Sequence, residues 1–205
     1  MENTVKLIGF YGSDETHACS AWTSTSAELN DDKRSRLAKF VKQLGEDGHH
    51  TPFEKSLLHF ICTTDIATHI QILKHRIGVS VNSESARYKE LKEDKYYLPV
   101  DWPETMLLRL EKASEQAFKN YHEAIEDLVK DGFTRKRAKE SARFFLQYNQ
   151  QYTIDISFNF RSFMHFQGLR NSEHAQLEVC NVAEEMLSEV RNTGKFNATL
   201  EAFGY

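Results

Sequence analysis

The chain has 205 residues, of which 40% are hydrophobic and 12% aromatic, enough for one domain with a buried core. Its 26 basic and 30 acidic side chains leave a formal charge of -4, so no basic excess favours a nucleic-acid partner. Neither a membrane-spanning run nor a signal-peptide pattern is present. The widely spaced Cys19, Cys62 and Cys180 predict neither a disulfide framework nor a zinc site, which favours a reduced, cytoplasmic protein without metal.

The first part of the chain predicts two strands and two helices. Residues 4–10 are apolar and β-leaning, and we expect a short strand there. Residues 31–44 carry apolar side chains at helical intervals behind two aspartates, which predicts a capped helix. The apolar run over residues 56–63 predicts a buried strand, and Asp65 is a suitable N-cap for a helix over residues 65–76.

The second part of the chain is richer in helix. Residues 104–130 form a long amphipathic pattern, and residues 134–146 predict a further helix. Polar and apolar residues alternate over residues 151–160, which favours a strand, and residues 161–169 then become helical. Ser172 is expected to cap a last long helix. Predicted helices and strands follow one another in mixed order, with more helix than strand. This predicts the α+β class, as a single domain over all 205 residues.

Three clusters of polar residues carry possible chemistry. The first is the segment over residues 48–54, which gathers imidazole, hydroxyl and carboxylate groups within a few positions. One interpretation is a solvated loop that leads into a turn started by proline. The other is a loop that contacts a ligand, and the residues alone leave both open.

The second cluster combines cations with short hydrogen-bonding side chains. On the predicted helix, Gln71, Lys74 and His75 share one face at positions i, i+3 and i+4. Cations at a helix C-terminus complement the macrodipole, but this does not explain the Ser- and Asn-rich loop that follows and ends at Arg87. Such a pattern suits a phosphorylated ligand, with a solvated loop as the equally weighted alternative.

The third cluster leads into the last predicted helix. Arg161 and His165 lie four residues apart on one helix face, and Arg170 follows. If Ser172 opens the next helix, His174 falls in its first turn, where a charged imidazole is disfavoured. His174 is then either neutral or held by an anion, and the neighbouring arginines favour a ligand over a purely structural role.

The sequence motifs of several enzyme classes are absent from this chain. We find no Ser-His-Asp order, nucleophile elbow, P-loop, dinucleotide-binding glycine motif or His-Glu-x-x-His metal motif. Cys62 lies in an apolar run, and no cysteine has the basic neighbours that activate a thiol. Nucleophilic catalysis by serine or cysteine is therefore disfavoured.

In their order along the chain, these segments resemble the flavin-dependent thymidylate synthases. That family has an Arg-His-Arg triplet and a Ser-x-Arg-Tyr motif, which are similar to Lys-His-Arg at residues 74–76 and Ser-Ala-Arg-Tyr at residues 85–88. Its Gly-His-x-Thr-Pro-Phe-Glu segment matches residues 48–54. Two further family patterns resemble residues 159–162 and 169–176, so the matched blocks extend over most of the chain.

The resemblance implies an enzyme that methylates dUMP to dTMP. Its carbon donor would be methylenetetrahydrofolate, and its hydride would come from FAD reduced by NADPH, without a cysteine nucleophile. The resemblance also implies a helix-rich α+β fold with a central, mostly antiparallel sheet. It further implies a homotetramer with active sites at subunit interfaces, with no nucleic acid or membrane as partner.

The resemblance also implies roles for individual residues. Arg170 would be catalytic, because it matches an arginine that polarises the uracil ring. The flavin-site positions are His49, Thr51, Glu54, Lys74, His75, Arg76, Asn82, Asn159, Arg161, His165 and His174. The nucleotide-site positions are Gln71, Lys74, Ser83, Glu84, Ser85, Ala86, Arg87, Arg143 and Arg170.

The chain departs from the family pattern at three places. Lys74 replaces the first arginine of the triplet, and a lysine lacks the planar fork of a guanidinium. The loop after Arg76 is one residue longer than the family's usual spacing. Ser83 stands where a glutamate is expected, with Glu84 one position later. A further local change is His165, which replaces an asparagine. These departures leave open an alternative function, that of a non-catalytic homologue which binds nucleotide and flavin.

Overall fold

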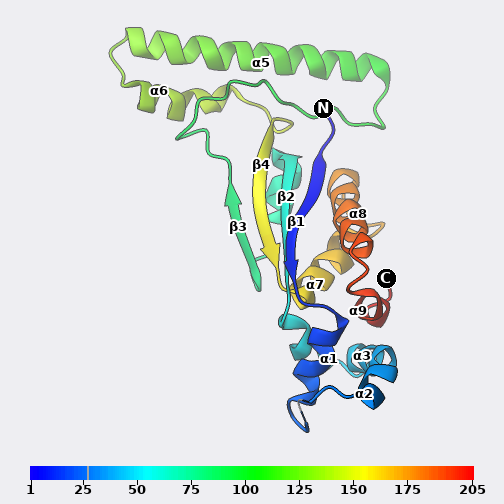
Figure 1. Ribbon diagram of the computed structural model, residues 1–205. Helices are drawn as coiled ribbons and strands as arrows, with labels where there is room; N and C mark the ends of the chain where they lie inside the picture. The colour runs from blue at the N-terminus through cyan, green and yellow to red at the C-terminus, as the bar shows by residue number, and fades with distance from the viewer. Residues whose placement is uncertain (27) are drawn as a thin grey trace. The chain divides into compact units, whose positions relative to one another are not determined.

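The computed structural model describes residues 1–26 and 28–205 (Figure 1). Four strands form one sheet in the order β1-β2-β4-β3, and neighbouring strands run in opposite directions. Their bounds are β1 Thr4–Tyr11, β2 Leu57–Asp65, β3 Val79–Ser83 and β4 Gln151–Phe158. The sheet and the surrounding helices confirm the predicted α+β class with its central antiparallel sheet.

Helices account for most of the remaining chain. The described residues form α1 Asp14–Trp22, α2 Asp31–Ser35, α3 Leu37–Glu46, α4 Ile66–Ile72, α5 Glu104–Lys130, α6 Arg135–Ala142, α7 Phe160–Arg170, α8 Leu177–Asn192 and α9 Asn197–Ala202. Two 3-10 turns, η1 Thr51–Glu54 and η2 Arg143–Phe145, complete the set. Among the residues described, no helix combines the length and the apolar character that crossing a bilayer requires.

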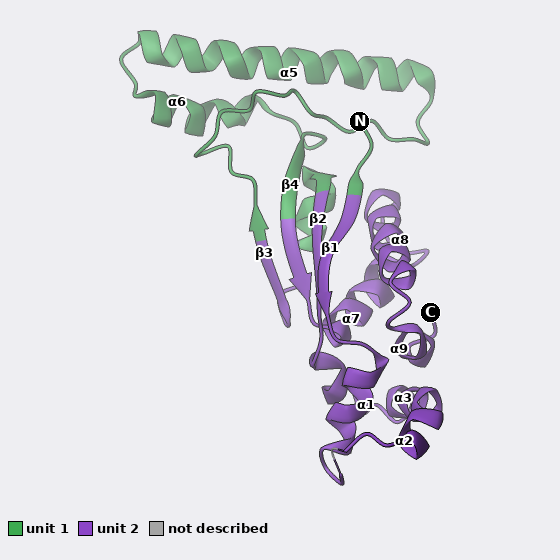
Figure 2. Ribbon diagram, viewed as in Figure 1, with its two compact units in different colours: residues 1–4, 63–72, 82–154 green, residues 5–62, 73–81, 155–205 purple. Residues whose placement is uncertain are grey.

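The chain divides into two compact units (Figure 2). Unit 1 comprises Met1–Thr4, Thr63–Ile72 and Asn82–Ile154, and unit 2 comprises Val5–Cys62, Leu73–Val81 and Asp155–Tyr205. Each strand contributes residues to both units.

Unit 1 is built on the long helix α5. Its buried side chains include Phe118, Tyr121 and Ile125, which recur at helical spacing along one face. They share a hydrophobic cluster with Ala138 of α6 and with Leu91, whose backbone N–H donates to the Tyr121 hydroxyl at 3.2 Å. The apolar periodicity therefore predicted this helix with its observed bounds, because its stripe is what the unit buries.

Unit 2 has an aromatic core between the sheet and α7. Phe163 lies with its ring centroid 5.8 Å from Phe60 of β2 and 5.7 Å from Phe158 of β4. The ring centroids of Phe166 and Phe158 are 5.3 Å apart, and those of Phe160 and Phe163 are 6.0 Å apart. Burying one face of α7 in this way leaves its opposite face available to bind a ligand.

Two predicted helices have different bounds in the structure. The helix predicted over residues 65–76 begins as expected after Asp65 but ends at Ile72. The last long helix begins at Leu177 with Gln176 as its N-cap, and Ser172 instead donates its hydroxyl back to the Leu169 carbonyl at 3.5 Å. Ser172 thus bonds back to the last turn of α7 and does not open α8, which corrects the prediction.

Smaller differences concern the N-terminal half. The helix predicted over residues 31–44 is interrupted at Arg36, and Asn30 provides its N-cap by accepting from the Lys33 backbone N–H at 2.9 Å. The segment predicted as a polar loop before Ser83 is the edge strand β3. Short polar residues are tolerated on an edge strand because one side of the strand stays solvated.

We expect Asp65→Ala to lower the free energy of unfolding by about 1–3 kcal/mol. The carboxylate of Asp65 is buried and accepts the Thr68 backbone N–H at 2.9 Å, the Thr68 hydroxyl at 2.7 Å and the Asn3 amide at 2.8 Å. Its removal leaves these donors unpaired inside unit 1. Urea denaturation followed by circular dichroism measures the loss, and Asp101→Ala at an exposed position is the control. Equal midpoints for the two variants would contradict this account.

Candidate functional site

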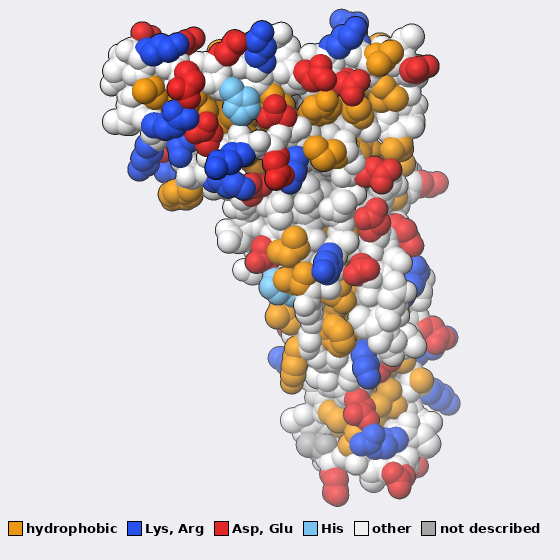
Figure 3. All heavy atoms as spheres, turned by 45° about the horizontal axis from the view of Figure 1, so that its top comes forward, with side chains coloured by type: hydrophobic (Ala, Val, Ile, Leu, Met, Phe, Trp, Pro, Cys, Tyr) orange, Lys and Arg blue, Asp and Glu red, His pale blue; other side chains and the backbone are white. Residues whose placement is uncertain are grey.

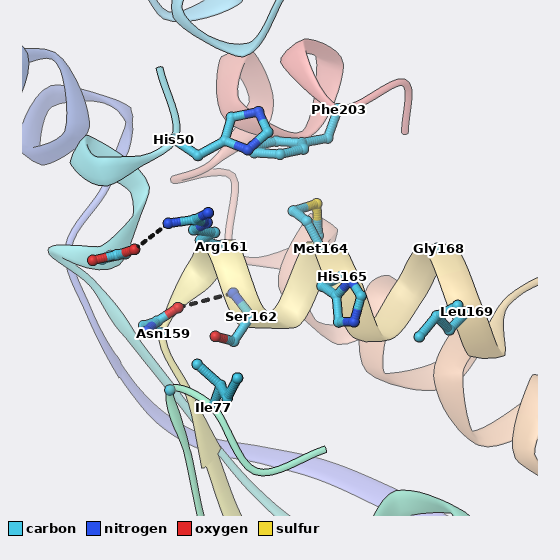
Figure 4. A pocket seen from close by; sticks show the side chains of 12 residues that line it. His50, Ile77, Asn159, Arg161, Ser162, Met164, His165, Gly168, Leu169 and Phe203 are labelled. Carbon is cyan, nitrogen blue, oxygen red and sulfur yellow. Dashed lines mark hydrogen bonds and ion pairs between the residues drawn. The ribbon is translucent and has the colours of Figure 1, made fainter. Parts of the chain in front are cut away.

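Unit 2 contains a cavity of about 800 Å³ beside α7 (Figure 4). This volume is within the range of small-molecule and cofactor sites. Its walls come from η1, from the turn before β3, from one face of α7 and from the C-terminal segment after α9. The lining residues are His50, Glu54, Ile77, Gly78, Asn159, Arg161, Ser162, Met164, His165, Gly168, Leu169 and Phe203.

Helix α7 presents opposite faces to the core and to the cavity. Arg161, His165, Gly168 and Leu169 recur at positions i, i+4, i+7 and i+8 and all line the cavity. Figure 4 labels these four positions along α7 and draws the side chains of Arg161, His165 and Leu169. The predicted i, i+4 pair of Arg161 and His165 is thus brought to one face, on which Gly168 contributes no side chain at its own position.

The turn before β3 is fixed against the start of α7. Asn159 caps the helix by accepting the Ser162 backbone N–H at 2.8 Å, and its own N–H donates to the Gly78 carbonyl at 2.9 Å. Gly78 has φ +65, and a Cβ built on it would lie 2.2 Å from Asn159 Nδ2 and 2.3 Å from Ser162 Oγ. Only glycine fits this close approach, which holds the turn as one wall of the cavity.

Charged and aromatic groups complete the rim. Arg161 Nη1 donates to Glu54 Oε1 at 2.6 Å, so two residues predicted for the flavin site form an ion pair there. Both side chains are partly exposed, at 50% and 34% respectively. His50 lies against Phe203 with ring centroids 5.1 Å apart (Figure 4). The cavity therefore offers a cation, an imidazole and flat apolar surfaces together.

A second pair of predicted residues meets next to this cavity. Arg170, the last residue of α7, donates through Nε to Nε2 of His75 at 3.0 Å. His75 also packs its ring on Phe166 at 5.0 Å and lies 6.1 Å from the ring of His165. Burial, followed by the nearby Arg170 and His165, lowers the pKa of His75 to about 4, so the imidazole is neutral at physiological pH.

Other predicted residues of unit 2 do not line this cavity. His49 lines a second hollow of about 450 Å³, and its neighbour His50 lines the larger cavity instead. Thr51, Lys74 and Arg76 are exposed, the last two because the chain has left the helix by that point. His174 lies in the segment between α7 and α8 with its side chain 89% exposed, next to Glu173.

Unit 1 holds most of the residues predicted for the nucleotide, and also Asn82 from the flavin set. The predicted nucleotide-site residues in unit 1 are Gln71, Ser83, Glu84, Ser85, Ala86, Arg87 and Arg143. Within the unit, Arg87 Nε lies 3.6 Å from Glu140 Oε1, and Arg143 donates through Nε to the Glu140 carbonyl at 3.1 Å. Figure 3 shows basic side chains gathered with acidic ones over the α6 end of this unit. The two arginines predicted for phosphate thus share one neighbour.

The last residue of β3 and the residues that follow it have partners within unit 1. Ser83 Oγ lies 3.3 Å from His69 Nε2, and the Glu84 carboxylate accepts the Thr153 backbone N–H at 3.4 Å. Ala86 is buried at 2% exposure in the α5 cluster. Both Ser83 and Glu84, the two possible replacements for the missing glutamate, therefore have partners within unit 1.

Sequence reasoning missed several cavity residues. Phe203 comes from the C-terminal segment, and Met164 and Leu169 look like ordinary core residues of a helix. A glycine among polar residues suggests a turn with positive φ, and Gly78 has φ +65 in the structure. That glycine is the sequence signal by which this turn was predictable. In the part of the chain that the structure describes, no three His, Cys, Asp or Glu side chains are grouped as metal ligands.

The whole fold is similar to a solved structure of a UMP/dUMP methylase from Streptomyces cacaoi bound with 5-Br dUMP. The TM-score is 0.80 with 26% identity, covering 98% of this chain and 94% of that chain. The fold is therefore one used by a class of nucleotide-methylating enzymes.

The chain belongs to the Thy1 family, described as thymidylate synthase complementing protein, whose model matches residues 6–193. Curated relatives agree. A flavin-dependent thymidylate synthase of Pseudothermotoga lettingae is 34% identical over 85% of this chain and 79% of its own length. Another, from Thermotoga neapolitana, is 29% identical over 97% of this chain and 89% of its own.

Proposed function

We propose that this protein is a flavin-dependent thymidylate synthase. It methylates dUMP to dTMP with methylenetetrahydrofolate as carbon donor and NADPH as reductant, without a cysteine nucleophile. The observation that carries the proposal is the large cavity on α7, where Arg161, His165 and Glu54 converge in a chain of this family.

The cavity fits a flavin in size and chemistry. Apolar and aromatic side chains such as Met164 and Phe203 offer flat surfaces for a planar ring, and Gly168 adds no Cβ to that face. Arg161, His165 and His50 supply hydrogen bonds to polar ring atoms or to phosphate oxygens. These residues would hold FAD, which supplies the hydride once reduced.

Arg170 is proposed as the residue that makes the pyrimidine reactive. Methyl transfer to C5 requires electron density at that carbon, and a guanidinium beside the ring stabilises the anion that carries it. The thiol route is disfavoured because burial raises the pKa of Cys62 to about 12, so this thiol stays protonated. Cys19 and Cys180 are not among the cavity residues.

The phosphate of dUMP is assigned to Arg87 and Arg143. Both arginines are exposed and adjoin Glu140, Arg87 through an ion pair and Arg143 through a hydrogen bond, so their guanidinium groups are accessible to phosphate oxygens. The family resemblance supports assembly as a homotetramer in which subunits complete one another's active sites. Sedimentation of the purified protein tests that assembly directly.

The decisive experiment measures tritium release from C5-labelled dUMP. Purified protein receives FAD, NADPH and methylenetetrahydrofolate, and both tritiated water and dTMP are quantified. We expect equal amounts of the two products, because C5 loses one hydrogen for each methyl group gained. Binding of flavin and dUMP without tritium release would instead establish the non-catalytic homologue, which Lys74 and Ser83 favour.

A further inference from the structure

His17 of α1 is fully buried in unit 2, and both of its ring nitrogens have hydrogen-bond partners. Nδ1 lies 2.8 Å from the hydroxyl oxygen of Thr199, and Nε2 lies 2.9 Å from that of Ser56. Burying a polar ring costs free energy unless its nitrogens are paired, and here both are. His17 does not itself line the cavity beside α7, so any effect on that cavity passes through its partners.

The direction of each hydrogen bond follows from a carboxylate at one end of the chain of bonds. Asp14 accepts the Thr199 hydroxyl at 2.6 Å, so the single hydroxyl proton of Thr199 is already donated. Nδ1 of His17 must therefore donate to Thr199, and Nε2 of the neutral ring accepts from the Ser56 hydroxyl. The Phe53 carbonyl, at 3.5 Å, is the weaker acceptor for that hydroxyl. Burial lowers the pKa of His17 to about 4, which keeps the ring neutral at physiological pH.

The same carboxylate fixes the start of α9. Asp14 accepts the backbone N–H of Ala198 at 2.9 Å and that of Thr199 at 2.8 Å. Backbone N–H groups in the first turn of a helix have no partner within the helix, so these two bonds cap α9 from α1. Phe203, which lines the cavity, directly follows α9. The chain of bonds therefore ties α1 to the C-terminal wall of the cavity.

The ring of His17 also packs against two other elements that carry cavity walls. Its centroid lies 5.2 Å from that of Phe53 in η1 and 5.4 Å from that of Phe160 at the start of α7. Phe53 packs on Phe203 at 5.0 Å, and Phe203 packs on His50 at 5.1 Å (Figure 4). His17 thus contacts η1, α7 and α9, which carry or adjoin three of the four walls.

Hydrogen bonds position these elements more narrowly than ring packing does. Hydrophobic contact is non-directional, whereas a hydrogen bond requires its donor and acceptor within narrow limits of distance and angle. One rigid ring bonds Ser56, two residues after η1, and Thr199 in α9. The spacing between its two nitrogens therefore fixes the spacing between η1 and α9.

We propose that His17 is a positioning residue for the cavity beside α7, a neutral two-sided link that holds η1 and α9 at the spacing the bound flavin requires. It acts through His50, which precedes η1, through Glu54, which ends it, and through Phe203. The inference rests on the proposed function for the identity of the ligand. The link itself is a property of the fold and is testable without flavin.

His17→Phe keeps a ring among its aromatic neighbours but removes both hydrogen bonds. We expect the Kd for FAD to rise by about 5- to 20-fold, because the walls lose their fixed spacing. The melting temperature should fall by about 3–10 °C. Fluorescence of FAD titrated with flavin-free protein, well below the melting temperature, measures the Kd. A lower melting temperature with an unchanged Kd would leave His17 a merely structural residue and overturn the proposal.

Tyr121→Phe is the matched control for lost stability. It removes a buried hydroxyl that accepts the Leu91 backbone N–H at 3.2 Å, but in unit 1. We expect a similar fall in melting temperature with an unchanged Kd for FAD. An equal rise in Kd for this control would show that instability alone weakens binding, against the proposal.

A double-mutant cycle tests the link through Ser56. Ser56→Ala alone should raise the Kd for FAD, because it removes the donor to Nε2 of His17. In a His17→Phe background it should add nothing, since that bond is already absent. Additive effects would mean that Ser56 acts independently of His17 and would contradict the two-sided link.

NMR of flavin-free protein tests the link without its ligand. In the wild type we expect the Nδ1–H tautomer of His17 and nuclear Overhauser contacts between the rings of His50 and Phe203. His17→Phe should weaken these contacts, and Tyr121→Phe should preserve them. An Nε2–H tautomer, or contacts that survive His17→Phe, would refute the inference. The expected NMR results in a protein that binds no flavin would refute the proposed function alone.

Discussion

Arg170→Ala should lower dTMP formation by about 10²- to 10³-fold, the usual loss when a charge-stabilising donor is removed. The guanidinium is the group assigned to the pyrimidine anion, and Nε holds it to His75 at 3.0 Å. Flavin content should stay close to that of the wild type, because Arg170 is not among the residues that line the cavity. Tritium release measures the reaction, and absorbance at the flavin maximum relative to protein measures binding.

Two further variants interpret this loss. Arg170→Lys keeps the charge but lacks the Nε–H that His75 accepts, so we expect activity between those of the wild type and the Ala variant. Arg191→Ala removes an exposed arginine of α8 paired with Glu184 at 3.1 Å, and it should leave the rate unchanged. Parallel loss of flavin and activity in Arg170→Ala would show that Arg170 serves cofactor binding instead.

Local patterns predicted those elements whose burial is periodic along the sequence. The apolar stripe of α5 is read directly from residues 104–130. The alternation over residues 151–160 predicts the strand that the structure has as β4, which ends two residues earlier, at Phe158. The same rule placed Arg161 and His165 on one face of α7. In these cases the spacing of side chains along a single element was enough to predict its type and which residues share a face.

The rules failed where distant residues decide the local structure. The helix predicted to Arg76 stops at Ile72, and His75 bonds to a residue 95 positions later in the chain. Ser172 looked like an N-cap, but its hydroxyl has a partner behind it in α7. Hydrogen-bonding side chains can stabilise either neighbouring element, and only the tertiary arrangement selects one.

The cavity itself was predictable only in part. Arg161, His165, Glu54 and Asn159 were expected at a ligand site, and they line one cavity. Phe203 contributes from the far end of the chain, without a motif that marks it. A wall supplied by an apolar side chain has no sequence signature, because the same residue type fills any core.

Gly78→Ala is expected to destabilise the protein by about 2–4 kcal/mol and to abolish most flavin binding. An L-residue is strained at φ +65, and the added Cβ would overlap Asn159 Nδ2 at 2.2 Å and Ser162 Oγ at 2.3 Å. Relief requires moving either the turn or the N-cap of α7, and both form the cavity wall. Urea denaturation measures the stability loss, and flavin retained after gel filtration measures the binding loss.

Gly194→Ala separates backbone strain from the steric overlap. Gly194 has φ +63, nearly the same as Gly78, but a Cβ there would meet no atom within 4 Å. It should therefore lose only about 1–2 kcal/mol for the left-handed conformation and keep its flavin. Equal effects of the two variants would mean that the turn accommodates a Cβ. A larger loss for Gly78→Ala would instead assign the requirement for glycine to the contact with α7, which sets the width of the cavity at that wall.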